Sequence, residues 1–283
     1  MDVTTNLSGF KKDITKPSIK LPRGACDAHM HIIGPFSSFP LVETKTLNPG
    51  EAILEDFLSR QKILGLDRCV VVQPSFYGTD NSCTLNAVAR MGNDARAVVV
   101  IDPEISDEEL RRLHEAGARG IRLQRVVSGG INPQKIAQMA ERLASLGWHI
   151  QLFVGEEFFL DCPVDLNDLP VPVVIDHMAH FDPSQGTDGA GFRAFLGLLE
   201  RGNVWAKISN CFFHAAIERA RALVTANPER CMWGSDWPHV VFRGSAPDDG
   251  ALVDDLEAIC GDEHTLELVL ARNAGKLYFN EAA

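Results

Sequence analysis

The sequence predicts a single (β/α)8 barrel of the α/β class, and three observations support this fold. The chain has 283 residues, of which 45% are hydrophobic, and this is enough for one large core. Short apolar runs rich in β-branched residues alternate with amphipathic stretches, as in parallel strands joined by crossover helices. Eight such runs fit within about 250 residues, the usual size of this barrel. A doubly wound open sheet is the alternative, but no Gly-rich phosphate loop follows the first run.

The expected elements follow a polar arm at residues 1–23, and residues 24–283 form the barrel domain. The arm contains two prolines, and we expect it to lie on the surface or against a neighbouring subunit. Strands are expected at 25–32, 68–73, 97–101, 120–123, 148–154, 171–177, 204–208 and 230–234. Helices are expected at 54–64, 84–91, 107–116, 133–146, 192–201 and 215–226, with one or two more at 254–259 and 263–270. The link between the fifth and sixth strands is short and rich in proline, so a helix there is doubtful.

Composition excludes several classes of partner and location. The formal net charge is −11, and no run of Lys and Arg could track a phosphate backbone, so nucleic acid and anionic membranes are not expected partners. The chain has no apolar N-terminal segment and no apolar run of about 18 residues, which predicts a soluble cytoplasmic protein. Seven cysteines without a C-x-x-C pair fit free thiols in a reducing compartment.

Polar residues at the ends of three expected strands predict an active site. The first strand ends in Asp27-Ala28-His29-Met30-His31, and a side-chain period of two points residues 27, 29 and 31 the same way, into the mouth of the barrel. The carboxyl ends of barrel strands carry the catalytic residues of this fold. Two imidazoles spaced in this way can share one ligand.

The sixth and eighth strands add His177 and Asp236 to this mouth. Together with His29 and His31 they form three nitrogen ligands and one oxygen ligand, a set that suits either a metal centre or a general-base site. One Zn²⁺ or Mn²⁺ is therefore expected, or no metal at all. The expected fifth strand ends without Lys or His, so a two-metal centre is not expected. The motifs of serine esterases, P-loop proteins, zincins and dinucleotide-binding folds are absent.

The same residues resemble the amidohydrolase superfamily, and more closely its 2-pyrone-4,6-dicarboxylate lactonase group. The superfamily motifs are D-x-H-x-H, I-D-H-M and W-G-S-D-W-P-H on the first, sixth and eighth strands. The closer resemblance rests on VQPS at 72–75, GTDN at 78–81, GIR at 120–122 and PDDG at 247–250. This group opens cyclic esters, and its relatives include hydrolases of sugar lactones and muconolactone and a galactarolactone isomerase. The likeness extends from about residue 24 to residue 273.

The resemblance implies a role for each residue that matches a motif. Asp236 resembles the general base that activates water, and the three histidines resemble the groups that bind and polarise the lactone carbonyl, with or without a metal. Ser75 and Arg122 match positions that hold a substrate carboxylate. We expect Tyr77 to donate a hydrogen bond to the substrate, and His239 to contact the substrate or support Asp236.

Three departures from the group argue against a dicarboxylate substrate. Arg125 is displaced from the position of a second arginine, Phe153 replaces a tyrosine, and His180 replaces an arginine. Neither His nor Phe reproduces the bidentate fork by which Arg binds a carboxylate. The expected protein is therefore a lactonase for a small anionic lactone of aromatic or sugar acid catabolism, with Arg125 and His180 beside the substrate. The alternatives are a lactone isomerase, a non-oxidative decarboxylase on the same barrel, or a binding protein that has lost activity.

Overall fold

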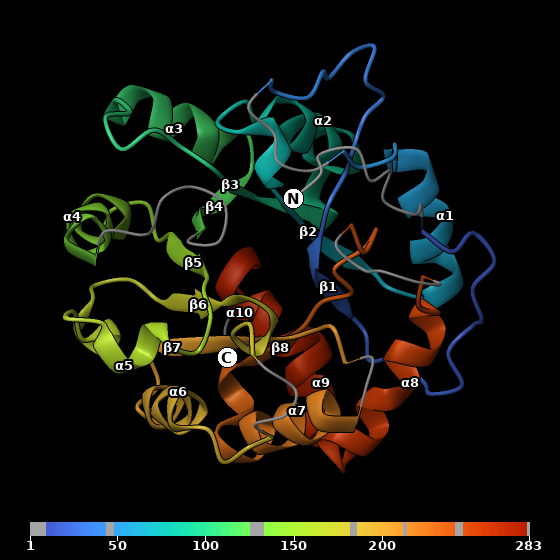
Figure 1. Ribbon diagram of the computed structural model, residues 1–283. Coiled ribbons are helices and arrows are strands. Elements are labelled where there is room, and N and C mark those ends of the chain that lie inside the picture. Colours follow the sequence, from blue (N-terminus) through green and yellow to red (C-terminus); the bar gives the residue numbers. More distant parts are fainter. Residues whose placement is uncertain are drawn as a thin grey trace.

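The computed structural model describes residues 10–43, 48–124, 133–181, 186–211, 214–240 and 246–281. Eight parallel strands pair in chain order and form a nearly closed barrel (Figure 1). The strands are β1 (Cys26–Met30), β2 (Arg68–Val72), β3 (Ala95–Val99), β4 (Ala118–Gln124), β5 (His149–Phe153), β6 (Val173–Ile175), β7 (Val204–Ile208) and β8 (Cys231–Trp233). The predicted (β/α)8 barrel is confirmed.

The first and last strands meet through the segment that follows β8. Met30 and Trp237 form a parallel bridge, and the Asp236 amide donates to the His29 carbonyl at 2.8 Å. The seam between β1 and β8 therefore passes through the residues expected to carry the chemistry. This arrangement brings two distant parts of the chain to the mouth of the barrel.

Helices surround the strands and cover the outer face of the barrel (Figure 1). They are α1 (Leu54–Leu64), α2 (Ser82–Met91), α3 (Asp107–Glu115), α4 (Pro133–Ala144), α5 (Phe158–Asp161), α6 (Ala190–Glu200), α7 (His214–Ala226) and α8 (Asp249–Cys260). The six helices expected between strands are confirmed, and α5 is a single turn in the proline-rich link. None of the helices that the structure describes is long and apolar enough to cross a membrane.

The C-terminal segment closes the N-terminal end of the barrel. It contains α9 (Glu263–Glu267), a π-helical turn at Leu268–Arg272 and α10 (Asn273–Phe279), so it extends past the helix expected at 263–270. Tyr278 is fully buried and packs into the barrel among inward-facing strand residues such as Val70 and Val174. Its ring also meets the ring of His149 edge to face, with 5.0 Å between centroids.

The described part of the N-terminal arm packs on this chain's own α8. Lys11 and Thr15 both contact the Asp248 carboxylate, with Lys11 Nζ at 2.7 Å and the Thr15 amide at 2.9 Å. The Phe10 ring lies 4.9 Å from that of Trp237, next to the seam of the barrel. The arm therefore lies beside the segment that carries Asp236.

Candidate active site

His29 lies on β1 and His31 follows the end of this strand, and a partner of each Nδ1 atom orients its ring. His31 Nδ1 donates to the Val72 carbonyl at 2.7 Å, which leaves Nε2 facing the mouth. His29 Nδ1 lies 3.1 Å from Asp176 Oδ1. The register of β1 is irregular between Asp27 and Met30, which interrupts the alternation of side chains.

Asp27 does not join the two histidines, contrary to the expectation from a regular strand. Its carboxylate accepts hydrogen bonds from the Ser235 amide at 2.9 Å and from Ser235 Oγ at 2.5 Å. Asp27 therefore fixes the segment that leads from β8 to Asp236. The irregular register of β1 explains the difference, because the period of two holds only in an unbroken strand.

Three imidazoles converge on one oxygen of Asp236. Its Oδ1 lies 3.4 Å from His31 Nε2 and 3.7 Å from both His29 Nε2 and His177 Nε2. Asn210 Nδ2 donates to the other oxygen, Oδ2, at 3.1 Å. Burial alone would raise the pKa of Asp236, but the three histidines hold it well below its usual value. The carboxylate is therefore ionised at neutral pH.

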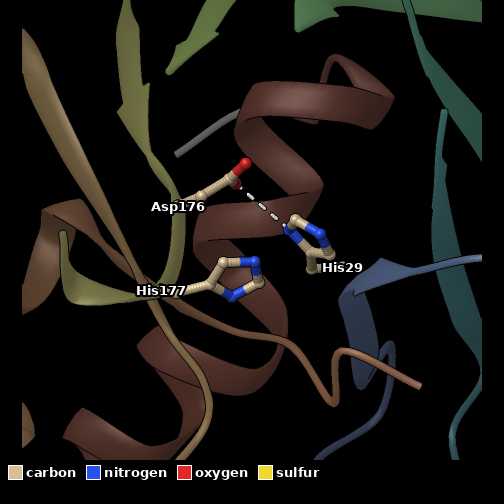
Figure 2. A group of neighbouring side chains, drawn as sticks. All are labelled: His29, Asp176 and His177. Carbon is tan, nitrogen blue, oxygen red and sulfur yellow. Dashed lines mark ion pairs between the residues drawn. The ribbon is translucent and has the colours of Figure 1, made fainter. Parts of the chain in front are cut away.

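A turn after β6 aims two consecutive side chains, Asp176 and His177, at the same site (Figure 2). The expected strand 171–177 stops at Ile175, and Asp176–Met178 form a 3₁₀ turn in which His177 has φ 52°. In a strand these neighbours would face opposite sides of the sheet. The turn instead directs the ring of His177 to Asp236, and its Nδ1 lies 2.8 Å from Ser209 Oγ.

Left-handed backbone recurs at the ends of β6, β7 and β8. His177, Asn210 and Asp236 have φ of 52°, 59° and 61°. Such values are uncommon outside glycine, and they persist where surrounding contacts enforce them, often at functional sites. All three side chains meet around the Asp236 carboxylate, so the local strain coincides with the candidate site.

A buried layer of charge lies beneath the histidines. Asp176 is fully buried, and its Oδ2 accepts from Arg122 Nε at 2.9 Å. Lys207, on β7, is also fully buried, with Nζ 2.7 Å from Gln151 Oε1, 3.3 Å from His29 Nδ1 and 3.9 Å from Asp176 Oδ1. Burial lowers the pKa of Lys207 to about 8 although Asp176 favours its charged form, so the amine is protonated at neutral pH.

A profile of the amidohydrolase family matches residues 26–279. The chain belongs to the amidohydrolase family. The match spans the whole barrel, from β1 to α10, and therefore includes every residue of the site described above.

Several proteins of named function align with nearly all of this chain. A 2-pyrone-4,6-dicarboxylate hydrolase from Comamonas testosteroni is 34% identical and covers 94% of both chains. A 4-sulfomuconolactone hydrolase from Rhizobium radiobacter is 31% identical and covers 92% of both. A D-galactarolactone isomerase from Agrobacterium fabrum is 30% identical, covering 93% of this chain and 94% of that protein. A crystal structure of an Agrobacterium tumefaciens protein superposes with a TM-score of 0.84 at 29% identity, covering 94% of this chain and all of the other.

The expected substrate-binding residues of this amidohydrolase lie in different surroundings. Arg122 is nearly buried, and its Cζ lies 5.1 Å from the centroid of the Phe153 ring. His180 is exposed, and its ring meets the same Phe153 ring edge to face, with 6.1 Å between centroids. Ser75 is half-buried at the start of the 3₁₀ turn after β2. Arg125 lies outside the described residues.

Two of the expected contact residues face the protein itself. The Tyr77 hydroxyl accepts from the Gly34 amide at 2.8 Å, and the side chain is only 1% exposed. His239 Nε2 lies 2.8 Å from Asp249 Oδ1, and Arg60 pairs with Oδ2 of the same carboxylate. Both side chains thus have partners within the protein, and their expected contact with the substrate stays a prediction.

The residues that sequence reasoning missed are those that hold the histidines. Asp176, Lys207, Ser209 and Asn210 contact the cluster. Asp176 stands in the I-D-H-M motif but has no role assigned to it there, and the other three stand in none of the quoted motifs. Their one signal is a polar residue at an inward position of a strand or just beyond its end, as Lys207 shows within the apolar run 204–208. A buried Lys in such a run has a cost that a functional partner would explain.

The donor set of the site fits one divalent metal ion. His29, His31 and Asp236 each offer one ligand atom, all within 4.8 Å of one another, and so do His29, Asp176 and His177. His29 Nε2 is buried and has no hydrogen-bond partner among the described residues. The bond from His31 Nδ1 to a carbonyl is the outer contact that metal-binding histidines commonly make.

Proposed function

We propose that the protein hydrolyses a small lactone that carries one anionic group. The observation that carries this proposal is the ionised Asp236 carboxylate, buried at the mouth of the barrel with three imidazoles around one of its oxygens. Relatives that cover at least nine-tenths of the chain are named as hydrolases of a pyrone dicarboxylate and of a sulfomuconolactone. Both named substrates are anionic lactones.

The reaction would begin with water beside Asp236. As the water oxygen bonds to the lactone carbonyl carbon, Asp236 takes one of its protons. A low pKa keeps this carboxylate ionised and at the same time limits its strength as a base, so the carbonyl must also be activated.

The imidazoles would supply this activation. His177 can donate from Nε2 to the developing oxyanion when the Ser209 hydroxyl donates to its Nδ1. When the ring C–O bond breaks, the proton held by Asp236 passes to the departing alkoxide, and the product is a hydroxy acid. The charges then balance, and Asp236 is again a carboxylate.

A metal ion held by His29, His31 and Asp236 would polarise the carbonyl and lower the pKa of a bound water. His31 would keep its Nε2 lone pair for the ion through the bond from Nδ1 to Val72. Asp176, which lies beside His29 Nδ1, would likewise leave the Nε2 lone pair of His29 for the ion.

Arg122 would bind the anionic group of the substrate. Its Nε donates to Asp176 Oδ2, and its guanidinium packs against the ring of Phe153 at the mouth. One arginine with His180 and Phe153 nearby suits a mono-anion better than a dianion, because neither neighbour can make a second bidentate contact. Lactones of the muconolactone, pyrone or sugar-acid type that carry a single carboxylate meet this description.

A lactone isomerase is the second candidate, because a relative at 30% identity is named D-galactarolactone isomerase. A hydroxyl of the substrate would then attack the carbonyl in place of water, with Asp236 as the same base.

A panel of anionic and neutral lactones, incubated with the protein and a pH indicator, separates these candidates. Hydrolysis releases acid, whereas isomerisation changes the NMR spectrum at constant pH. Gas release would identify a decarboxylase, and no reaction with any lactone would contradict the proposal.

A further inference from the structure

Lys207 is a buried cation for which the proposed reaction has no direct use. It is fully buried on β7, beneath the histidines, and the ring of Tyr278 lies 5.9 Å from its Nζ on the far side. A substrate that enters at the mouth would meet the histidines before this amine. A buried ammonium is costly unless it is paired, so its partners indicate what it does.

The contacts of Asp176 join Lys207 to Arg122. The carboxylate binds Arg122 through Oδ2 at 2.9 Å, and its Oδ1 lies 3.9 Å from Lys207 Nζ. Two cations thus share one carboxylate, and the three groups carry a net charge of +1. Without Lys207, the remaining pair of Arg122 and Asp176 would be neutral.

This net charge decides how strongly Arg122 attracts an anionic group of the substrate. A guanidinium that is paired one to one with a buried carboxylate attracts a second carboxylate only weakly. At similar distances, the attraction of the second carboxylate to the guanidinium is nearly cancelled by its repulsion from the first carboxylate. A second cation on the far side of Asp176 restores the attraction. Gln151 Oε1, 2.7 Å from Lys207 Nζ, holds the amine in place for this purpose.

We propose that Lys207 is a positioning residue that compensates the charge of Asp176 and so leaves the charge of Arg122 available to the anionic group of the substrate. This inference rests on the proposed function, in which Arg122 binds that anion. It adds a residue that lies beneath the histidines and acts on substrate selectivity through charge alone.

The test compares a carboxylate-bearing γ-lactone with its methyl ester, and the readout is the ratio of their kcat/KM values. Effects on the chemical step act on both substrates and cancel in this ratio. Lys207→Met should lower the ratio on the order of tenfold, mainly through KM of the anionic lactone. Lys207→Arg should keep most of it, and Lys207→Gln provides a second neutral variant if Lys207→Met does not fold.

The decisive variant is the double substitution Lys207→Met with Asp176→Asn, which removes one positive and one negative charge. We expect it to regain the ratio that Lys207→Met loses, because no carboxylate at position 176 then neutralises the charge of Arg122. A double variant as unselective as Lys207→Met would overturn the inference. His149→Gln is the matched control, since His149 is a buried polar residue of the same barrel interior and is uncharged at neutral pH. It should leave the ratio within about threefold of the wild type.

Failure of the proposed function gives a different result. If Arg122→Met lowers kcat/KM equally for both lactones, Arg122 does not bind the anion, whatever Lys207 does. If no lactone reacts, binding of cyclopentanecarboxylate and of cyclopentanecarboxamide, followed by NMR titration, replaces turnover. Lys207→Met should then weaken binding of the carboxylate alone, and equal binding by wild type and variant would contradict the role of Lys207.

Discussion

Asp236 lies at the centre of the site, and each of the three imidazoles around its carboxylate is fixed by a partner of its own. Val72 orients His31, Asp176 orients His29 and Ser209 orients His177. The Asp236 backbone is itself tied to β1 through its amide. A carboxylate held in this way needs little reorganisation when it takes a proton, which is what efficient proton transfer requires.

Replacing Asp236 by Asn should therefore remove catalysis without removing the fold. Asparagine has nearly the same shape but cannot take a proton from water, so we expect kcat to fall on the order of 10²–10⁴-fold with a similar KM. Steady-state kinetics and circular dichroism measure the two effects. Full turnover in the variant would exclude Asp236 as the base.

Arg122→Met should discriminate between charged and neutral lactones. An anionic lactone would lose its cationic partner in a nearly closed site, which should cost roughly 2–5 kcal/mol in kcat/KM. A neutral lactone should lose far less. An equal loss for both would assign Arg122 to holding Asp176 in place and not to the substrate.

At this scale the sequence predicts the four residues that meet at the mouth but not their supports. His29, His31, His177 and Asp236 stand in motifs and have expected roles, whereas Asp176 stands in I-D-H-M without one. The alternation of side chains along a strand does not predict the left-handed backbone of His177, which turns the side chains of Asp176 and His177 to the same site. It likewise places Asp27 with the histidines, from which an irregular register separates it.

Among the elements, β5 begins with a polar side chain that is buried at the end of the barrel opposite the candidate site. His149 begins this strand, and its ring packs over Gly120 of β4, where a Cβ would lie 2.3 Å from the ring. Burial, with a contribution from Lys207, lowers the pKa of His149 to about 3. The side chain is therefore neutral at any pH near neutrality.

This burial predicts a pH dependence of stability. The unfolded chain protonates this histidine below about 6.5, whereas the folded protein resists protonation until about 3, so the unfolded state binds more protons between these values. The free energy of unfolding should fall as the pH drops, with His149 contributing about 2 kcal/mol between pH 7 and pH 5. Urea unfolding of wild type and His149→Gln at both pH values measures this difference, and parallel losses in the two proteins would contradict it.

The secondary structure that surrounds the site could be predicted well, and the C-terminal closure could not. Helix 54–64 and strand 204–208 have the predicted bounds, because amphipathic or apolar periodicity and terminal glycines mark them. The segment after α8 shows a helical pattern, but nothing in it indicates that Tyr278 enters the barrel. Such a tertiary contact depends on the space inside the eight-stranded barrel, and local sequence patterns do not encode the shape of that space.

For the whole molecule, the barrel places the ligand atoms of His29, His31 and Asp236 within 4.8 Å of one another, although residues 29 and 236 are 207 positions apart in sequence. If these atoms hold one ion, adding Zn²⁺ to chelator-treated protein purified without a His tag should raise Tm, because binding to the folded state stabilises it. The rise in Tm should reach its maximum at one equivalent of Zn²⁺. Differential scanning calorimetry with metal analysis measures this. His31→Asn should abolish the shift, and His180→Asn, at an exposed histidine of the same mouth, should preserve it. A wild-type Tm that does not respond to Zn²⁺ would leave the imidazoles as hydrogen-bond donors to the carbonyl.

The attack of water on a lactone carbonyl is the central claim, and isotope labelling tests it most directly. An anionic lactone turned over in H₂¹⁸O should yield a hydroxy acid with one ¹⁸O in the new carboxylate, detected by mass spectrometry with fragmentation. The rate of labelling should fall with Asp236→Asn as turnover falls. A product without ¹⁸O, or with ¹⁸O in the hydroxyl group, would contradict the account.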